Sequence, residues 1–323
     1  MVRVALPGAA MRARGTRLLL PAFMLALAAP ALRADVLVND TWLDSSRTDP
    51  AAPINSEMGV DSDLDGNLES AWYSSGTGAS LTPSPGHLLM TMGTSSASWT
   101  THFTPDGSPV TLLNAGDQLK ITWQFTPNNV NASNTSQNFR IAVTDTPTAA
   151  RLASDATPGT AAYTGYALFS NMGQTLGNAN PFQLRERTNP GPGGSGAFLS
   201  SSGDWSALAN GVSSGAAGYT SGTLYTMIMT LTRTAAGELD VNVTMSGGTL
   251  NGTGTASVSF TDPTPNGGSF SFDTFGIRPS DVASSASSFD TVLFKVEGPS
   301  VPEPASLAIL GLSGLALVGR RSR

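Results

Sequence analysis

The sequence predicts an all-β protein built as a single jelly-roll β-sandwich, and three observations carry that prediction. Apolar and polar residues alternate in several runs, as they do in strands that bury one face. Glycine and proline are abundant, at 35 and 21 of 323 residues, and they separate these runs with turns. Only 12% of the residues are charged, which disfavours surface helices because these rely on Glu and Lys. No long helix is therefore expected in the body of the chain.

The clearest strands lie in the middle and at the end of the body. Two alternating runs between Tyr225 and Met245 flank a short turn at Ala235–Gly237 and predict a hairpin. The interval 149–222 is less regular, and no strand is assigned there. Other strands are predicted at Gln118–Pro127, Asn138–Asp145, about Ser269–Arg278 and about Phe289–Val296.

Residues 1–34 have the layout of a secretory signal peptide. Arginines precede an apolar run at Leu18–Ala31, and small residues follow it. Cleavage is predicted after Ala31 or Ala34. The Sec translocon is the expected partner of this segment, and the chain is expected to be exported.

Residues 299–323 have the layout of a second targeting signal with three parts. The 15-residue apolar run 305–319 would cover about 22 Å as a helix, less than the roughly 30 Å of a bilayer core. Basic residues after it would stay cytoplasmic under the positive-inside rule. We therefore expect a short transmembrane segment that anchors the chain transiently in the inner membrane. The three parts are the tripeptide Pro302, Glu303 and Pro304, the apolar run Ala305–Gly319, and the arginines Arg320, Arg321 and Arg323.

This order of parts resembles the PEP-CTERM sorting signal of exported bacterial proteins. The resemblance implies that an exosortase-type membrane enzyme recognises Pro-Glu-Pro, removes the anchor and passes the body to the cell surface or its polysaccharide matrix. The body, residues 35–298, is similar to concanavalin-like (laminin-G-like) jelly rolls through loose motifs such as FDTFGIRPS and SSFDTVLFKVEG. That likeness implies contact with polysaccharide, because lectins, glycan-binding modules and some glycosidases share the architecture.

Charge and cysteine content exclude several classes of function. The formal net charge is -6, and eight of the 17 basic residues lie in the two targeting segments. The acidic body would repel phosphate, so nucleic acid is not an expected partner. Without any cysteine, the chain cannot form disulfides or Cys-ligated metal sites.

The run DSDLDGNLE, beginning at Asp61, is the candidate metal site. Carboxylates at alternate positions before a glycine are typical of tight calcium loops. An EF-hand needs a Glu at its twelfth position, and Trp72 stands there. Two interpretations stay open: a solvated acidic loop, or a looser calcium site on Asp61, Asp63, Asp65 and the Asn67 carbonyl.

The expected role is non-catalytic: a structural or glycan-associated component of the extracellular matrix. A carbohydrate-binding module is the first alternative. Trp99 and Trp205 are the tryptophans whose polar neighbours favour exposure and stacking on sugars, while a core or loop-anchoring role is the favoured interpretation of both. A glycoside-active enzyme using Asp61 and Glu69 is the second alternative. No catalytic residue is assigned, and the two histidines, His87 and His102, are interpreted as surface or strand residues.

Overall fold

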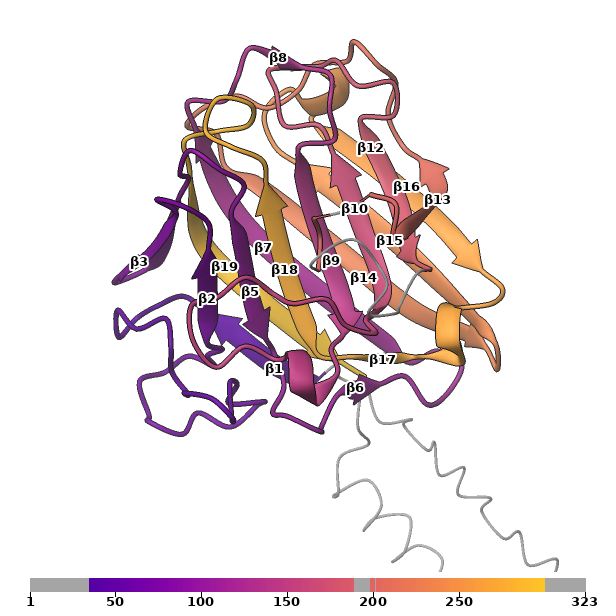
Figure 1. Cartoon of the computed structure of the whole chain (residues 1–323). Helices are drawn as coiled ribbons and strands as arrows, with labels where there is room; N and C mark the ends of the chain where they lie inside the picture. Colours follow the sequence, from indigo (N-terminus) through magenta and orange to yellow (C-terminus); the bar gives the residue numbers. More distant parts are fainter. Residues whose placement is uncertain (1–34, 189–197, 201, 300–323) are drawn as a thin grey trace, which may run out of the picture. The chain divides into compact units, whose positions relative to one another are not determined.

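The computed structural model describes residues 35–188, 198–200 and 202–299, which form two antiparallel sheets packed face to face (Figure 1). The predicted all-β sandwich is confirmed. The predicted signal peptide and the sorting residues from 300 onward lie outside the described residues.

One sheet has eight strands and contains the predicted hairpin, formed by β14 and β15. Its order is β16-β15-β14-β7-β19-β4-β3, and β1 also pairs with β19. The strands are β1 (Asp35–Asp40), β3 (Ser80–Ser84), β4 (His87–Thr91), β7 (Gln118–Asn128), β14 (Tyr225–Ala235), β15 (Glu238–Ser246), β16 (Thr255–Asp262) and β19 (Ser288–Gly298).

The other sheet has seven strands in the order β13-β12-β10-β9-β18-β5-β2. They are β2 (Trp72–Ser75), β5 (Ser98–His102), β9 (Phe139–Asp145), β10 (Thr164–Ser170), β12 (Phe182–Arg187), β13 (Trp205–Asn210) and β18 (Thr274–Pro279). Short pairs join β6 (Val110–Thr111) to β17 (Ser271–Phe272) and β8 (Ser133–Asn134) to β11 (Thr175–Leu176). Three single-turn 3-10 helices lie at η1 (Thr148–Ala150), η2 (Leu250–Gly252) and η3 (Asn266–Gly268).

The core lies between the sheets and is rich in aromatic rings that contact each other across them. Trp123 on β7 lies edge-on to Phe275 on β18, with ring centroids 6.2 Å apart. Trp72 on β2 lies edge-on to Phe294 on β19, with ring centroids 5.1 Å apart. Along β7 every second side chain is buried, as its sequence alternation predicts. Burial of these large rings supplies the main driving force for the sandwich.

The described part of the interval 149–222 contains four strands that the sequence did not reveal: β10, β11, β12 and β13. On β10 six of the seven residues are buried, so apolar and polar residues do not alternate. The physical reason is a second apolar cluster on the outer side of this sheet, where Phe169 packs against Phe198, Leu199 and Trp205. A strand covered on both faces loses the period of two by which it would be recognised.

Candidate functional site

The segment between β1 and β2, residues 41–71, gathers seven carboxylates and a single basic residue, Arg47. It runs as turns rather than as a strand or helix (Figure 1). An isolated bridge from Leu68 to Asn39 attaches it to β1, and a second bridge from Ser56 to Ser70 pairs two parts of the segment itself. The segment is therefore a folded loop that holds its acidic side chains close together.

The predicted calcium loop folds as a tight turn closed by its own aspartates. Asp61 accepts hydrogen bonds from the backbone N–H groups of Leu64 at 2.7 Å and Gly66 at 3.1 Å. Gly66 has a φ of +99°, a conformation that side chains rarely tolerate. Asp65 accepts from the backbone of Asn67 at 3.0 Å. The spacing of the motif thus builds the turn locally, whether or not an ion is bound.

The four predicted ligands do not meet at one point. Oxygen atoms of Asp61 and Asp63 lie within 4.8 Å of each other and of Glu57. Asp65 belongs to a different group of the same size, with Asp44 and Glu69.

A third group joins the other two through shared members. Asp63 and Glu69 both lie within 4.8 Å of Asp49 in this group. The sequence analysis missed Asp44, Asp49 and Glu57 as members of the cluster, and the only signal for them was the density of acids upstream of Asp61.

Glu57 and Glu69 are both buried, but their carboxylates differ in hydrogen bonding. The Glu57 carboxylate is fully engaged, because Oε1 accepts from the N–H and hydroxyl of Ser62 and Oε2 accepts from the N–H of Glu69. Glu69 is only 3% exposed, and its Oε2 has no hydrogen-bond partner. Asn67 is equally buried, and its Oδ1 also lacks a partner.

Electrostatics in this cluster oppose ionisation. Burial raises the pKa of Glu69 to about 9, and the charges of nearby aspartates act in the same direction. Burial also raises the pKa of Asp40 well above its usual range. Two like charges 4 Å apart repel by about 4 kcal/mol at an effective dielectric constant of 20. The cluster can relieve this repulsion by taking up protons or by binding a cation.

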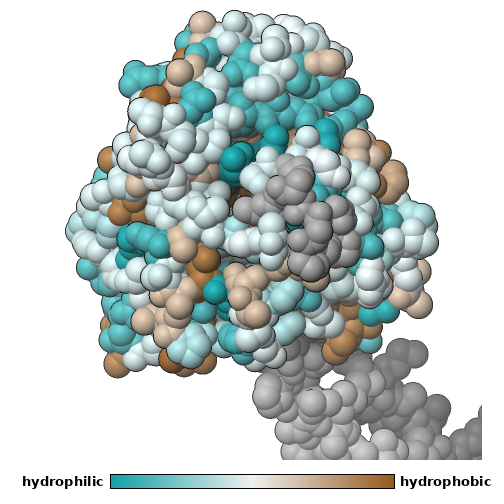
Figure 2. Space-filling model, in the orientation of Figure 1, coloured by the Kyte–Doolittle hydropathy of each residue, from teal (hydrophilic) through white to brown (hydrophobic). Residues whose placement is uncertain are grey.

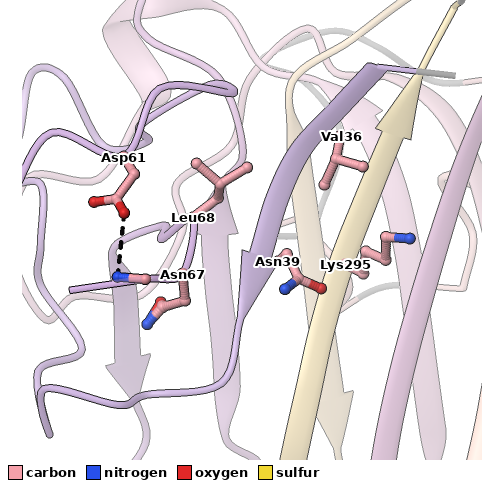
Figure 3. Close-up of a pocket in the computed structure, with 7 residues that line it drawn as sticks. Val36, Asn39, Asp61, Asn67, Leu68 and Lys295 are labelled. Atoms are coloured by element: carbon pink, nitrogen blue, oxygen red, sulfur yellow. Dashed lines mark hydrogen bonds between the residues drawn. The ribbon is translucent and has the colours of Figure 1, made fainter. Parts of the chain in front are cut away.

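A shallow pocket of about 340 Å³ adjoins the acidic turn (Figure 3). Asn39 on β1 and Lys295 on β19 line one side, and Asp61 and Asn67 line the other. Lys295 forms an ion pair with Glu297 at 3.0 Å. The pocket is polar and open, and it offers no pair of exposed carboxylates for acid–base chemistry.

The glycosidase alternative fits this geometry poorly. A retaining mechanism needs two carboxyl groups that reach the sugar, one as nucleophile and one as acid. Glu69 is buried beneath the acidic turn, and both oxygens of Asp61 are held by backbone amides. The arrangement suits hard-cation binding better than catalysis.

The prediction that Trp99 and Trp205 are exposed is wrong. Trp99 is 0% and Trp205 3% exposed. Trp99 lies in the main core beside Phe289, and Trp205 packs on Phe169 in the outer cluster. Their Ser, Thr and Asp neighbours in the sequence suggested exposure because these residues are polar. The prediction failed because other segments cover the seven-stranded sheet, and the local sequence does not show this covering.

No aromatic stacking platform is therefore formed by the described residues. Every tryptophan and tyrosine of the chain is buried. The large exposed apolar side chains are aliphatic, and Figure 2 shows brown only in small separate areas on the face it presents. They are Leu43, Ile54, Val60, Leu64, Leu113, Leu224 and Val282.

Both histidines lie on strands. His87 on β4 contacts Asp290 through Nδ1 at 2.8 Å at the surface. His102 on β5 is buried, where Nδ1 contacts the Thr274 hydroxyl and Nε2 accepts from the N–H of Leu152. Burial lowers the pKa of His102 to about 3. It is thus a neutral structural side chain.

The C-terminal residues of the chain match a known protein family model. Residues 300–323 match the family model of the PEP-CTERM protein-sorting motif. The chain carries a PEP-CTERM sorting motif. No curated protein matches the chain. No helix within the described ranges is long and apolar enough to span a membrane, and the predicted segment 305–319 of the PEP-CTERM motif lies outside those ranges.

Solved structures similar to the chain are lectin-like. The Emp47p carbohydrate recognition domain is 14% identical, with a TM-score of 0.41 over 70% of this chain and 88% of that one. The metal-free VIP36 exoplasmic/lumenal domain is 15% identical, with a TM-score of 0.42 over 72% and 91%. Peanut lectin is 9% identical, with a TM-score of 0.40 over 72% and 92%. A likeness of this degree transfers no function to the chain.

Proposed function

We propose that this chain is exported, sorted through its C-terminal PEP-CTERM motif, and retained at the cell surface or in the extracellular matrix as a non-catalytic, glycan-associated β-sandwich. The match at residues 300–323 carries the sorting half of the proposal. In this proposal residues 1–34 direct export through the Sec translocon. The run 305–319 then halts the chain in the inner membrane, and an exosortase-type enzyme cuts near Pro302, Glu303 and Pro304.

The physical logic of the tail supports this proposal. The arginines at 320, 321 and 323 would hold the end of the chain in the cytoplasm, so the body is left outside. Prolines on both sides of Glu303 favour an extended backbone, the form in which proteases bind their substrates. The anchor would then be temporary and the tripeptide the site of its removal.

Replacing Pro302, Glu303 and Pro304 together with alanine is expected to leave the chain uncut in the membrane fraction. Fractionation of the producing cells and the mass of the mature C-terminus measure this. Pro299→Ala is the matched control, because it removes a neighbouring proline outside the tripeptide, and it should be processed normally. Unchanged release of the triple variant would remove the sorting half of the proposal.

The glycan half is supported by the outer face of the eight-stranded sheet. Four adjacent strands present outward side chains in register, so that Lys120, Thr230, Asn242 and Ser259 lie side by side. Within the stretch where the four strands pair, all of the outward positions except Lys120, Ile228 and Asp240 bear a hydroxyl or a carboxamide. The positions are Gln118, Lys120, Thr122 and Gln124 on β7, Thr226, Ile228, Thr230 and Thr232 on β14, Asp240, Asn242, Thr244 and Ser246 on β15, and Thr255, Ser257, Ser259 and Thr261 on β16.

Such a face matches the chemistry of a polysaccharide. Hydroxyl and carboxamide groups both donate and accept, as sugar hydroxyls do. The outward side chains are half-buried or exposed, so a chain of sugars can lie across several strands. In this proposal hydrogen bonds replace the aromatic stacking that the buried tryptophans cannot provide.

Thr230→Val, Asn242→Leu and Ser259→Ala combined are expected to weaken retention on immobilised matrix polysaccharide at least about tenfold. Each lost hydrogen bond contributes about 1 kcal/mol, and 1.4 kcal/mol corresponds to a factor of ten. The control is Thr111→Val with Ser271→Ala, which removes an exposed hydroxyl pair on β6 and β17. Equal retention of both variants and the wild-type chain would contradict the proposed face.

A further inference from the structure

We propose that the segment between β1 and β2 binds one calcium ion on the carboxylates of Asp44, Asp65 and Glu69. This site differs from the one that the sequence motif suggests, because it is centred on Glu69 and leaves out Asp61 and Asp63. It is independent of the proposed sorting and glycan contact.

The three carboxylates converge from separate parts of the segment. One oxygen from each lies within 4.8 Å of the others, a spacing that a single ion can bridge with bonds of about 2.3–2.6 Å. Asn67 adjoins them, since its Nδ2 donates to Asp65 Oδ2 at 3.1 Å and contacts Glu69 Oε1 at 3.4 Å. Three carboxylates therefore meet at one point.

One buried carboxylate oxygen at this point has no hydrogen-bond partner. It is Glu69 Oε2, and Glu69 is 3% exposed. Buried acceptors almost always have a donor, so this oxygen is an observation separate from the grouping of the acids. An ion coordinated by it would supply the missing interaction.

No positive side chain of the described residues balances these carboxylates. Arg47, the basic residue of the segment, instead contacts Asp155 at 2.7 Å and the carbonyl oxygen of Trp72. The described ion pairs do not include Asp44, Asp65 or Glu69. A bound divalent cation would offset the repulsion among them.

The donor set favours calcium. All three protein ligands are carboxylate oxygen atoms, which hard cations prefer, and no cysteine or histidine takes part. Asp44 is exposed and Asp65 is half-buried, so water can complete the six to eight positions that calcium takes. Magnesium requires a stricter octahedron than side chains from a turn-rich segment readily provide.

The neighbouring group of Glu57, Asp61 and Asp63 is a weaker site. Backbone amides and the Ser62 hydroxyl already hold both oxygens of Glu57. Backbone amides likewise hold both oxygens of Asp61. We therefore assign that group to the structure of the turn and assign the ion to the Glu69 group.

The test measures binding of calcium alone to the full chain stripped of metal with a chelator. Titration calorimetry gives stoichiometry and affinity, and tryptophan-sensitised terbium luminescence gives a second readout. We expect one ion per chain, a rise in Tm with calcium, and weaker binding of magnesium.

The calcium affinities of single-residue variants test which carboxylates bind the ion. Asp44→Asn alters an exposed side chain, so the fold should persist, and calcium affinity should fall by roughly tenfold or more because one charged ligand is lost. Glu69→Gln should act in the same way. The matched control Asp61→Asn, a carboxylate of the same segment outside the site, should change the affinity by less than about threefold, since it removes no ligand. Absence of calcium binding, tighter binding of magnesium, or equal losses in Asp44→Asn and Asp61→Asn would overturn the assignment.

Discussion

Replacing Arg151 with methionine is expected to destabilise the sandwich by about 3–5 kcal/mol, because it leaves a buried charge without its partner. Arg151 Nη1 lies 2.7 Å from Asp273 Oδ2, and both side chains are only 5% exposed. The guanidinium also donates to the carbonyl oxygen of Thr104. Methionine has a similar length but offers neither charge nor donor. Urea or thermal unfolding followed by circular dichroism measures the loss.

The cost of Arg151→Met should depend on pH. Burial raises the pKa of Asp273 from 3.8 to about 6 even with the arginine present. Removing the positive charge raises that pKa further, so the folded variant takes up a proton more readily than the unfolded chain does. Protonation then stabilises the variant as pH falls through that range. The gap to wild type should be smaller at pH 5 than at pH 8.

An exposed ion pair serves as the control. Lys120 lies 2.8 Å from Glu297 with its side chain 37% exposed, and Lys120→Met should cost no more than about 1 kcal/mol. A cost for Arg151→Met that equals the control value and is the same at both pH values would contradict the assignment of a stabilising buried pair.

Trp99→Ala is expected to cost about 3–5 kcal/mol, the range for large aromatic side chains removed from a core. The indole is fully buried and meets the ring of Phe289 at 5.7 Å. Its Nε1 has no hydrogen-bond partner, so Trp99→Phe should recover much of the loss. Unfolding curves of the two variants measure the difference.

Leu113→Ala is the matched control for a large side chain on the surface. Leu113 is exposed, and its replacement should change stability by no more than about 0.5 kcal/mol. If Trp99→Ala were as stable as wild type but bound polysaccharide less well, the core assignment would be wrong and a stacking role would return.

The long alternating strands were predictable because each has one buried face and one solvated face. On β7 and β15 the period of two appears in the sequence and in the burial alike. The hairpin of β14 and β15 followed from the short turn at residues 235–237. By contrast, β10 carries apolar side chains on both faces, so its periodicity vanishes. On β12 only Phe182 and Leu184 are apolar, and polar Gln183 and Arg187 on the other face are buried as well, so only the folded chain reveals this strand.

Trp99 shows why local context fails for single residues. Its neighbours Ser98 and Thr100 point to the outer side of their sheet, yet both are buried as well. Other segments cover that side, and covering depends on contacts far apart in the sequence. The polarity of neighbouring residues therefore did not report exposure.

The sequence by itself determined the all-β class, the sorting motif at the tail and the tight turn at Asp61, because strand periodicity, targeting signals and aspartate caps all act within a few residues. Only the tertiary structure decided which acids share one point. Asp44 reaches Glu69 from 25 positions away, and their approach depends on how the segment between β1 and β2 folds back on itself, as at the bridge between Ser56 and Ser70. Distances between residues that are far apart in the sequence are set by tertiary packing, and local sequence patterns do not report them.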